Sequence, residues 1–152
     1  MAKTKKKNAD PPVRDWPAIR AFRHLLRAQA AVVEAHKQFL TREHDLTMAE
    51  FDMIAELGNT QGRRMGDLAK QMITSPANVT RIAARLEKRG WVQRRRAADS
   101  DREVVASLTA EGELFFADNF REVVGFTREV MQARLSDDEL DTLAKLCTRI
   151  HE

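Results

Sequence analysis

The sequence predicts a mainly α-helical fold with a small β-hairpin, an α+β class of protein. Through most of the chain, apolar residues recur every three or four positions, as they do in amphipathic helices. Residues that begin and end helices divide this pattern into several separate helices. After Gly90 the pattern changes to two strand-like segments, 91–96 and 103–108, joined by the turn-rich link 97–102.

The composition is that of one globular domain. The chain has 152 residues, of which 43% are hydrophobic and 32% are charged, and these values are typical of soluble proteins. No apolar run is long enough to cross a membrane, and the N-terminal residues lack the apolar segment of a signal peptide. We therefore expect a cytoplasmic protein with no membrane partner. The single cysteine, Cys147, excludes an internal disulfide framework.

The net charge of +3 hides an asymmetry along the chain. Residues 109–152 hold five basic and ten acidic residues, a net charge of −5, so residues 1–108 carry +8. The segment 75–96 alone holds seven cations and one acid, Glu87. A polyanion such as nucleic acid would be attracted to the middle of the chain and repelled by its end.

Residues 75–90 predict a well-defined amphipathic helix. Ser75 can cap its start and Pro76 suits the first helical position. Gly90 can end the helix, because glycine enters the left-handed conformation without a steric penalty. Aliphatic residues at helical spacing form the inner face, namely Val79, Ile82, Ala83 and Leu86.

The outer face of this helix differs in character. It carries small, hydrogen-bonding and cationic residues, namely Ala77, Asn78, Thr80, Arg81, Arg85 and Lys88. Small residues let a helix approach a surface closely, and the polar side chains can bond base edges and phosphates. An ordinary helix with a solvated basic face is the commoner case, so the flanking segments must decide between the two interpretations.

Those flanking segments predict a helix-turn-helix followed by a hairpin. Thr47 and Glu50 form a capping box that begins a helix ending at Gly58. A loop at 60–64 leads to a short helix over 65–72, and a tight turn at 73–74 joins it to the basic helix. A hairpin directly after such a helix is a wing. We therefore expect residues 47–108 to form a winged helix-turn-helix lobe that binds double-stranded DNA.

The wing itself is basic. Arg95 lies on its first strand and Arg102 lies near its tip. A narrow, A·T-rich minor groove attracts arginine, so this hairpin suits that groove.

The remaining helices predict a dimer. A long helix from about 15 to 43 has apolar residues on two sides, which require two partners. Further helices begin at Thr109 and Ser136, and the last one carries an aliphatic stripe. We expect residues 15–46 and 109–152 to form a helical dimerisation region, because too little chain remains to cover their apolar surfaces. Residues 1–14 are expected to form a disordered basic arm.

The order of these elements resembles the MarR family of winged-helix transcriptional regulators. The resemblance rests on the segment 78–96 (NVTRIAARLEKRGWVQRRR), on Asp99-x-Asp-Arg102, and on the junction 108–112 (LTAEG). It implies that Arg81 and Thr80 face the major groove, that Asp101 orients the wing, and that Arg102 enters the minor groove. The family usually has a second arginine after the wing Asp-Arg pair, where this chain has Glu103.

The resemblance also implies a function. Proteins of this family act as dimeric regulators, and we expect a repressor that binds a palindromic site and responds to a small aromatic or phenolic ligand. Family members take such ligands in a cleft between the dimerisation helices and the DNA-binding lobe, for which Trp16, His36 and Arg64 are candidates. An architectural, nucleoid-type DNA-binding protein without an effector is the alternative.

Other chemistries find little support in the sequence. The four histidines are scattered and have no cysteine or paired carboxylates at metal-ligand spacing, so no metal or cofactor is expected. The glycines do not form a phosphate-binding loop. An enzyme is therefore not expected. Cys147 lies on the apolar stripe of the last helix without a resolving cysteine, which favours a structural thiol over a redox sensor.

Overall fold

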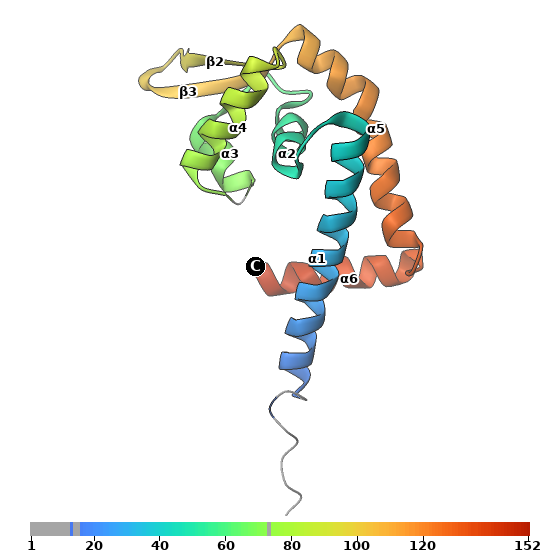
Figure 1. Ribbon diagram of the computed structural model, residues 1–152. Coiled ribbons are helices and arrows are strands. Elements are labelled where there is room, and N and C mark those ends of the chain that lie inside the picture. The colour runs from blue at the N-terminus through green and yellow to red at the C-terminus, as the bar shows by residue number, and fades with distance from the viewer. Residues whose placement is uncertain (1–12, 14–15, 73) are drawn as a thin grey trace, which may run out of the picture. The chain divides into compact units, whose positions relative to one another are not determined.

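The computed structural model describes residues 13, 16–72 and 74–152, and for Asp101 it describes the backbone alone. Most of the expected basic arm 1–14 lies outside these residues, as do Asp15 and Ile73. The described chain forms six α-helices and three β-strands (Figure 1), in the order α1 (Pro17–His44), α2 (Met48–Leu57), β1 (Arg63–Arg64), α3 (Met65–Gln71), α4 (Pro76–Lys88), β2 (Val92–Ala97), β3 (Ser100–Leu108), α5 (Ala110–Gln132) and α6 (Asp137–His151). The expected class, mainly helical with a small hairpin, is confirmed.

The chain divides into two compact units, residues 1–34 and residues 35–152, and each is described by itself. This division differs from the expected boundaries at 46/47 and 108/109. The reason lies in the core of the second unit, which takes in Phe39 and Leu40 from the end of α1 and Phe116 and Val123 from α5. These helices thus contribute to the winged-helix lobe as well as extending beyond it.

The helix starts follow the capping signals in the sequence. The Thr47 hydroxyl accepts a hydrogen bond from the Glu50 amide, and the Glu50 carboxylate accepts one from the Thr47 amide, which completes the capping box of α2. Ser136 and Glu139 do the same at α6. Ser75 caps α4 with Pro76 in its first turn, and Gly90, at φ +79°, follows the last residues of that helix. These expectations are confirmed.

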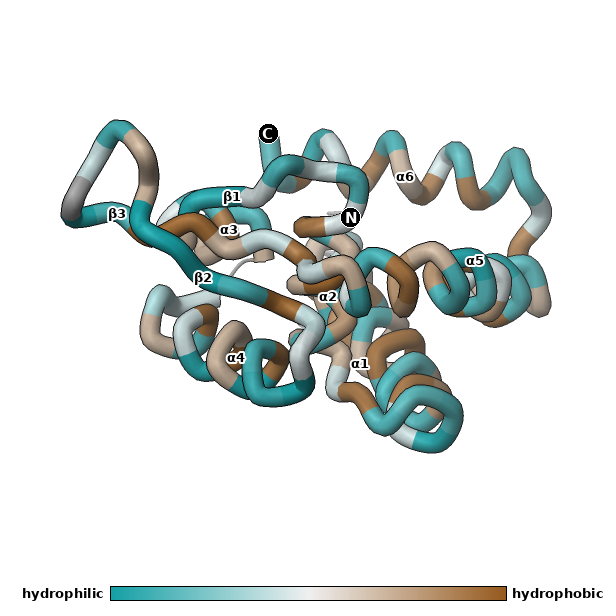
Figure 2. The backbone as a smooth tube through the Cα atoms, turned by 90° about the horizontal axis from the view of Figure 1, so that it is seen from above, coloured by the Kyte–Doolittle hydropathy of each residue, from teal (hydrophilic) through white to brown (hydrophobic). Residues whose placement is uncertain are grey.

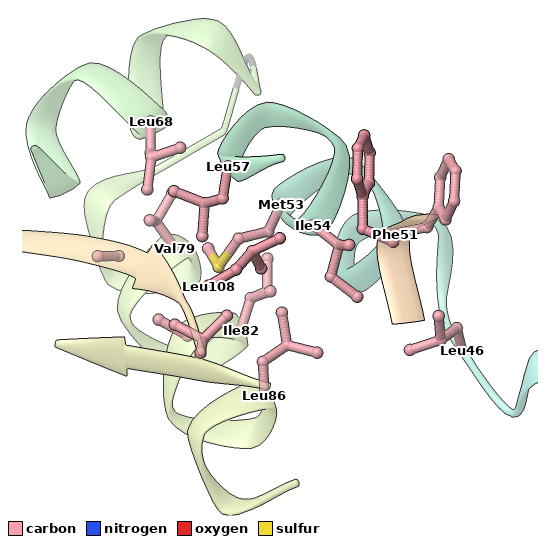
Figure 3. Close-up of a cluster of buried hydrophobic side chains, with 14 of the residues drawn as sticks. Leu46, Phe51, Met53, Ile54, Leu57, Leu68, Val79, Ile82, Leu86 and Leu108 are labelled. Carbon is pink, nitrogen blue, oxygen red and sulfur yellow. The ribbon is translucent and has the colours of Figure 1, made fainter. Parts of the chain in front are cut away.

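The core of the winged-helix lobe sits between α2, α3, α4 and the hairpin (Figure 3). Side chains with no exposed surface come from α2 (Leu57), α3 (Leu68) and α4 (Val79, Ile82, Leu86). Figure 3 shows that they converge with Leu108 of β3. The inner face expected for α4 is therefore the buried face, and its opposite face is left exposed.

The sheet corrects two expectations. Its strand order is β1-β3-β2, with Arg64 paired with Val105. The segment 60–64 was expected to be a loop, yet Arg63 and Arg64 form β1. They do so because the free edge of β3 offers backbone hydrogen-bond partners, which the local sequence pattern cannot predict. Strand β3 begins at Ser100, so Arg102 lies within a strand and not in the link where it was expected.

The last helix presents apolar side chains to the outside. No residue of α6 is buried, and Leu143, Leu146 and Ile150 are exposed. Figure 2 shows hydrophobic and hydrophilic residues alternating along α6. Cys147 is half-buried on this helix. None of the described helices has the length and hydropathy needed to cross a bilayer.

Candidate nucleic-acid interface

The outer face of α4 is the first part of the candidate site. Because Val79, Ile82, Ala83 and Leu86 are fully buried, the residues on the opposite side lie on the surface. The exposed members of the expected DNA-binding set on and next to this helix are Ser75, Ala77, Thr80, Arg81, Arg85 and Lys88, and Asn78 is half-buried. The exposed face thus combines a small residue, hydroxyl groups and three cations.

Arg81 is held in place by its own helix. Its Nη2 donates a hydrogen bond to Oδ1 of Asn78 at 2.9 Å, and Nδ2 of Asn78 donates to Oγ1 of Thr74 at 2.8 Å. This chain of hydrogen bonds connects the turn before α4 to the centre of the exposed face. An arginine held in this way loses less side-chain entropy when it binds a planar acceptor pair such as a guanine edge.

Two hydroxyl groups of the expected set already have backbone partners. Oγ of Ser75 accepts from the Asn78 amide at 3.2 Å, and Oγ1 of Thr80 donates to the Pro76 carbonyl at 3.0 Å. Ser75 therefore serves the helix start. Thr80 presents its methyl group and the remaining acceptor capacity of its oxygen to the surroundings.

Arg85 is tied to a buried carboxylate. Its Nε lies 3.2 Å from Oε1 of Glu50, whose side chain is only 8% exposed. The second oxygen of Glu50 accepts from the backbone and hydroxyl of Thr47. Arg85 therefore neutralises the capping carboxylate of α2, a role in addition to the phosphate contact expected from its position on α4.

Two further arginines fasten α4 to its neighbours. Arg94 of β2 donates two hydrogen bonds to Glu87 of α4, and these bonds lower the pKa of that carboxyl group. Arg89 donates to the backbone carbonyl of Asp45 at 2.7 Å and lies over the ring of Trp91. The hairpin and the α1–α2 connection are thereby fixed relative to α4.

The wing carries an irregularity at Arg102. Arg96 pairs with Val104, but the next residue, Ala97, pairs with Ser100. The residues of β3 between Ser100 and Val104, Arg102 among them, therefore have no partner in the register of β2. Such bulges redirect side chains. Arg102 is exposed, and among the described residues its guanidinium has no hydrogen-bond or ion-pair partner. The side chain of Asp101 lies outside the description, so its expected role in orienting the wing stays a prediction.

A second expected wing contact, Arg95, is also exposed, and its Nη2 lies 3.4 Å from the carbonyl of Gln61, to which it donates. Arg64, expected as a ligand contact, lies at the base of the wing. Its Nη2 is 2.5 Å from Asp99, and its Nη1 pairs with Glu103.

A cleft of about 350 Å³ joins the wing to α4. It brings together Thr80 and Arg102, two of the expected DNA-binding residues, with Arg64, which was expected elsewhere. The helix face and the wing therefore form one continuous surface.

The three expected ligand contacts have different surroundings. Trp16 belongs to the unit 1–34 and is 47% exposed. His36 is buried, shares a 2.8 Å hydrogen bond with Oγ1 of Thr127, and meets the ring of Phe126 edge-on. Arg64 is engaged in the wing.

The structure also gives three residues pairings that the sequence analysis did not predict. Glu50 and Glu87 orient Arg85 and Arg94, and Asn78 orients Arg81. The Asn78–Arg81 pair has helical spacing and could have been found from it. The pairs Arg85–Glu50 and Arg94–Glu87 join separate elements, so a local sequence pattern cannot predict them.

A helix-turn-helix whose second helix exposes cations, followed by a hairpin with an exposed arginine, defines the class of winged helix-turn-helix proteins. Residues 46–104 match the model of the MarR family. By this match, residues 46–104 are a MarR-family domain, the DNA-binding part of a family of transcriptional regulators.

Comparisons with individual proteins agree. An uncharacterised helix-turn-helix transcriptional regulator of Bacillus cereus is 29% identical over 115 residues, which cover 76% of each chain. The crystal structure of an E. coli MarR mutant with operator DNA gives a TM-score of 0.81 at 20% identity, over 93% of this chain and all of that one. NadR in complex with 4-hydroxyphenylacetate gives a TM-score of 0.69 at 23% identity, covering 99% of this chain and 97% of the other. Both structural likenesses concern the fold.

Proposed function

We propose that this protein is a homodimeric repressor that binds a palindromic site in double-stranded DNA. In this proposal α4 lies in the major groove, the β2–β3 wing lies in a flanking minor groove, and a small aromatic or phenolic compound modulates binding. The observation that carries the proposal is the exposed guanidinium of Arg81, held by Asn78 at the centre of the exposed α4 face. The operator DNA bound to the similar E. coli protein supports it.

The dimer is supported by apolar surface in each of the two units. In residues 1–34, Phe22 is 59% exposed and Leu26 is 50% exposed. In α6, Leu146 is 49% exposed and Ile150 is 71% exposed. Apolar side chains at helical spacing are normally covered, and a second copy would cover them through an isologous interface. Two-fold symmetry in the protein requires a palindrome in the DNA.

The ligand is supported by the aromatic compound in the similar NadR structure. Of the expected contacts, we retain Trp16 and His36. We assign Arg64 to the wing, because both ends of its guanidinium are engaged there. A thermal-shift screen of aromatic carboxylates and phenols, beginning with 4-hydroxyphenylacetate, tests this part, because a ligand of the native state raises the melting temperature.

A footprint on the DNA upstream of the protein's own gene tests the central part. A regulator protects one sharply bounded palindromic site. The protection persists in an excess of unrelated duplex DNA, because specific binding is much tighter than non-specific binding. Diffuse protection along the fragment would support the architectural alternative, which has no effector and no preferred site. Adding an effective ligand from the screen should remove the sharp footprint.

A further inference from the structure

The wing carries acidic side chains next to Arg102, the arginine expected to enter the minor groove, and the structure shows how two of them are neutralised. Arg102 has acidic residues close to it in the sequence, among them Asp99 and Glu103. Carboxylates on a surface that meets DNA would repel the phosphates and offset the attraction of Arg102. Both carboxylates form ion pairs with Arg64. We propose that Arg64 is a positioning residue of the wing: it neutralises Asp99 and Glu103 and leaves Arg102 as the cation presented to DNA.

The strand register explains how Arg64 reaches both acids. Arg64 in β1 pairs with Val105 in β3, so Glu103 is its diagonal neighbour two positions along the adjacent strand. Asp99 lies in the turn between β2 and β3. The planar guanidinium offers two separate amino groups, and each one serves a different carboxylate. A lysine ammonium lacks this fork and could not hold both carboxylates in the same way.

The same cleft contains Arg102, whose charge is not used in these ion pairs. Arg64, Arg102 and Glu103 all line the cleft beside Thr80. Within the described part of the chain, the Arg102 guanidinium has no partner. Arg64, Asp99, Arg102 and Glu103 carry two positive and two negative charges, so the group is neutral with Arg64 and carries −1 without it. Arg64 therefore offsets one of the two negative charges, those of Asp99 and Glu103, that lie close to Arg102 in the sequence.

This inference rests on the proposed function, since it concerns how the wing meets DNA. The experiment compares affinities for the footprinted duplex at one fixed salt concentration. The variants are Arg64→Gln, Asp99→Asn with Glu103→Gln, and the combination of all three. Arg63→Gln is the matched control, because the side chain of this neighbouring arginine of β1 bonds Glu56 of α2.

We expect Arg64→Gln to weaken binding by roughly five- to tenfold, which corresponds to the loss of one close charge interaction. The triple variant should bind within about twofold of the Asp99→Asn, Glu103→Gln variant, because Arg64 has nothing left to neutralise once the acids are gone. Arg63→Gln should bind like the wild type. Rescue by removing the acids is the result that a general structural role for Arg64 would not produce.

Two results would overturn the inference. If Arg64→Gln bound DNA as tightly as the wild type, Arg64 would have no role in the wing. If the triple variant stayed as weak as Arg64→Gln, Arg64 would contact DNA directly. Should Arg64→Gln unfold, Arg64→Lys provides the same comparison with the charge retained, and we expect an affinity between those of the wild type and the glutamine variant. Equal binding by wild type, Arg81→Ala and Arg102→Ala would contradict the proposed function itself, which separates the two failures.

Discussion

Arg94 on β2 and Glu87 on α4 form an ion pair that joins the wing to the helix proposed to lie in the major groove. Nη2 and Nε of Arg94 lie 2.6 Å and 3.1 Å from the same carboxylate oxygen, Oε2 of Glu87. Glu87 is the one acid within the basic segment 75–96. It therefore does not contribute a free negative charge to the candidate DNA-binding surface, because its charge is used to fix the hairpin.

This pair predicts a pH dependence. The hydrogen bond from Arg94 lowers the pKa of Glu87 below its ordinary value of 4.5. A lowered folded-state pKa stabilises the protein above the unfolded pKa, and the stabilisation is lost as pH falls through the folded value. We expect Glu87→Gln to lower the free energy of unfolding at pH 7 by less than about 1 kcal/mol, since the pair is partly exposed.

Denaturant unfolding at several pH values measures this effect. The difference between wild type and Glu87→Gln should shrink below pH 4.5. It should also shrink at pH 7 in about 1 M salt, where surface charges are screened. A difference that persists unchanged at low pH would show that the pair with Arg94 is not its source.

Two glycines of α5 predict opposite outcomes for the same substitution. A Cβ on Gly112 would lie 2.1 Å from the carbonyl oxygen of Trp91, whereas a Cβ on Gly125 would meet nothing within 4 Å. Gly112→Ala should destabilise the protein by about 1–3 kcal/mol, because backbone must move. Gly125→Ala should stabilise it by about 0.5–1 kcal/mol, because alanine loses less backbone entropy in a helix. Thermal unfolding of both variants checks the pair, and a shift of the same sign for both would contradict the packing described for α5.

The proposed dimer can be tested on α6. Leu146→Glu places a charge within the exposed apolar stripe, where the single chain leaves room for it. Sedimentation at micromolar concentration should give twice the chain mass for the wild type and one chain mass for Leu146→Glu. Lys145→Glu on the same helix is the control, and it should remain a dimer. A monomeric wild type would contradict both the dimer and the palindrome.

The sequence predicted the local features of this fold well, for a physical reason. The capping boxes at Thr47 and Ser136, the Ser75 cap and the stop at Gly90 depend on residues within one turn of each other. The inner face of α4 follows from helical periodicity alone. Features that depend on distant partners were missed. Strand β1 exists because β3 offers it an edge, and Arg64 lies at the wing because that pairing places it beside Glu103.

The same distinction between local features and distant partners applies to the candidate site. Arg81 and Thr80 could be placed on the exposed face from their spacing, whereas the tie between Arg85 and Glu50 joins α4 to α2 and has no counterpart in the local pattern. The sequence can thus indicate which side chains face outward. It cannot indicate which of those side chains are already engaged with another element.

The central claim, that the exposed face of α4 reads DNA sequence, is tested most directly with Arg81→Ala. Its affinity should be measured on the footprinted site and on single-base variants of that site at fixed salt, beside the wild type and Lys88→Ala. We expect Arg81→Ala to lose about 1–3 kcal/mol of binding free energy and to relax discrimination at one base position per half-site. Lys88→Ala should weaken binding to all sequences alike, because a phosphate contact carries no sequence information. An Arg81→Ala variant with unchanged affinity and unchanged base preference would contradict the claim.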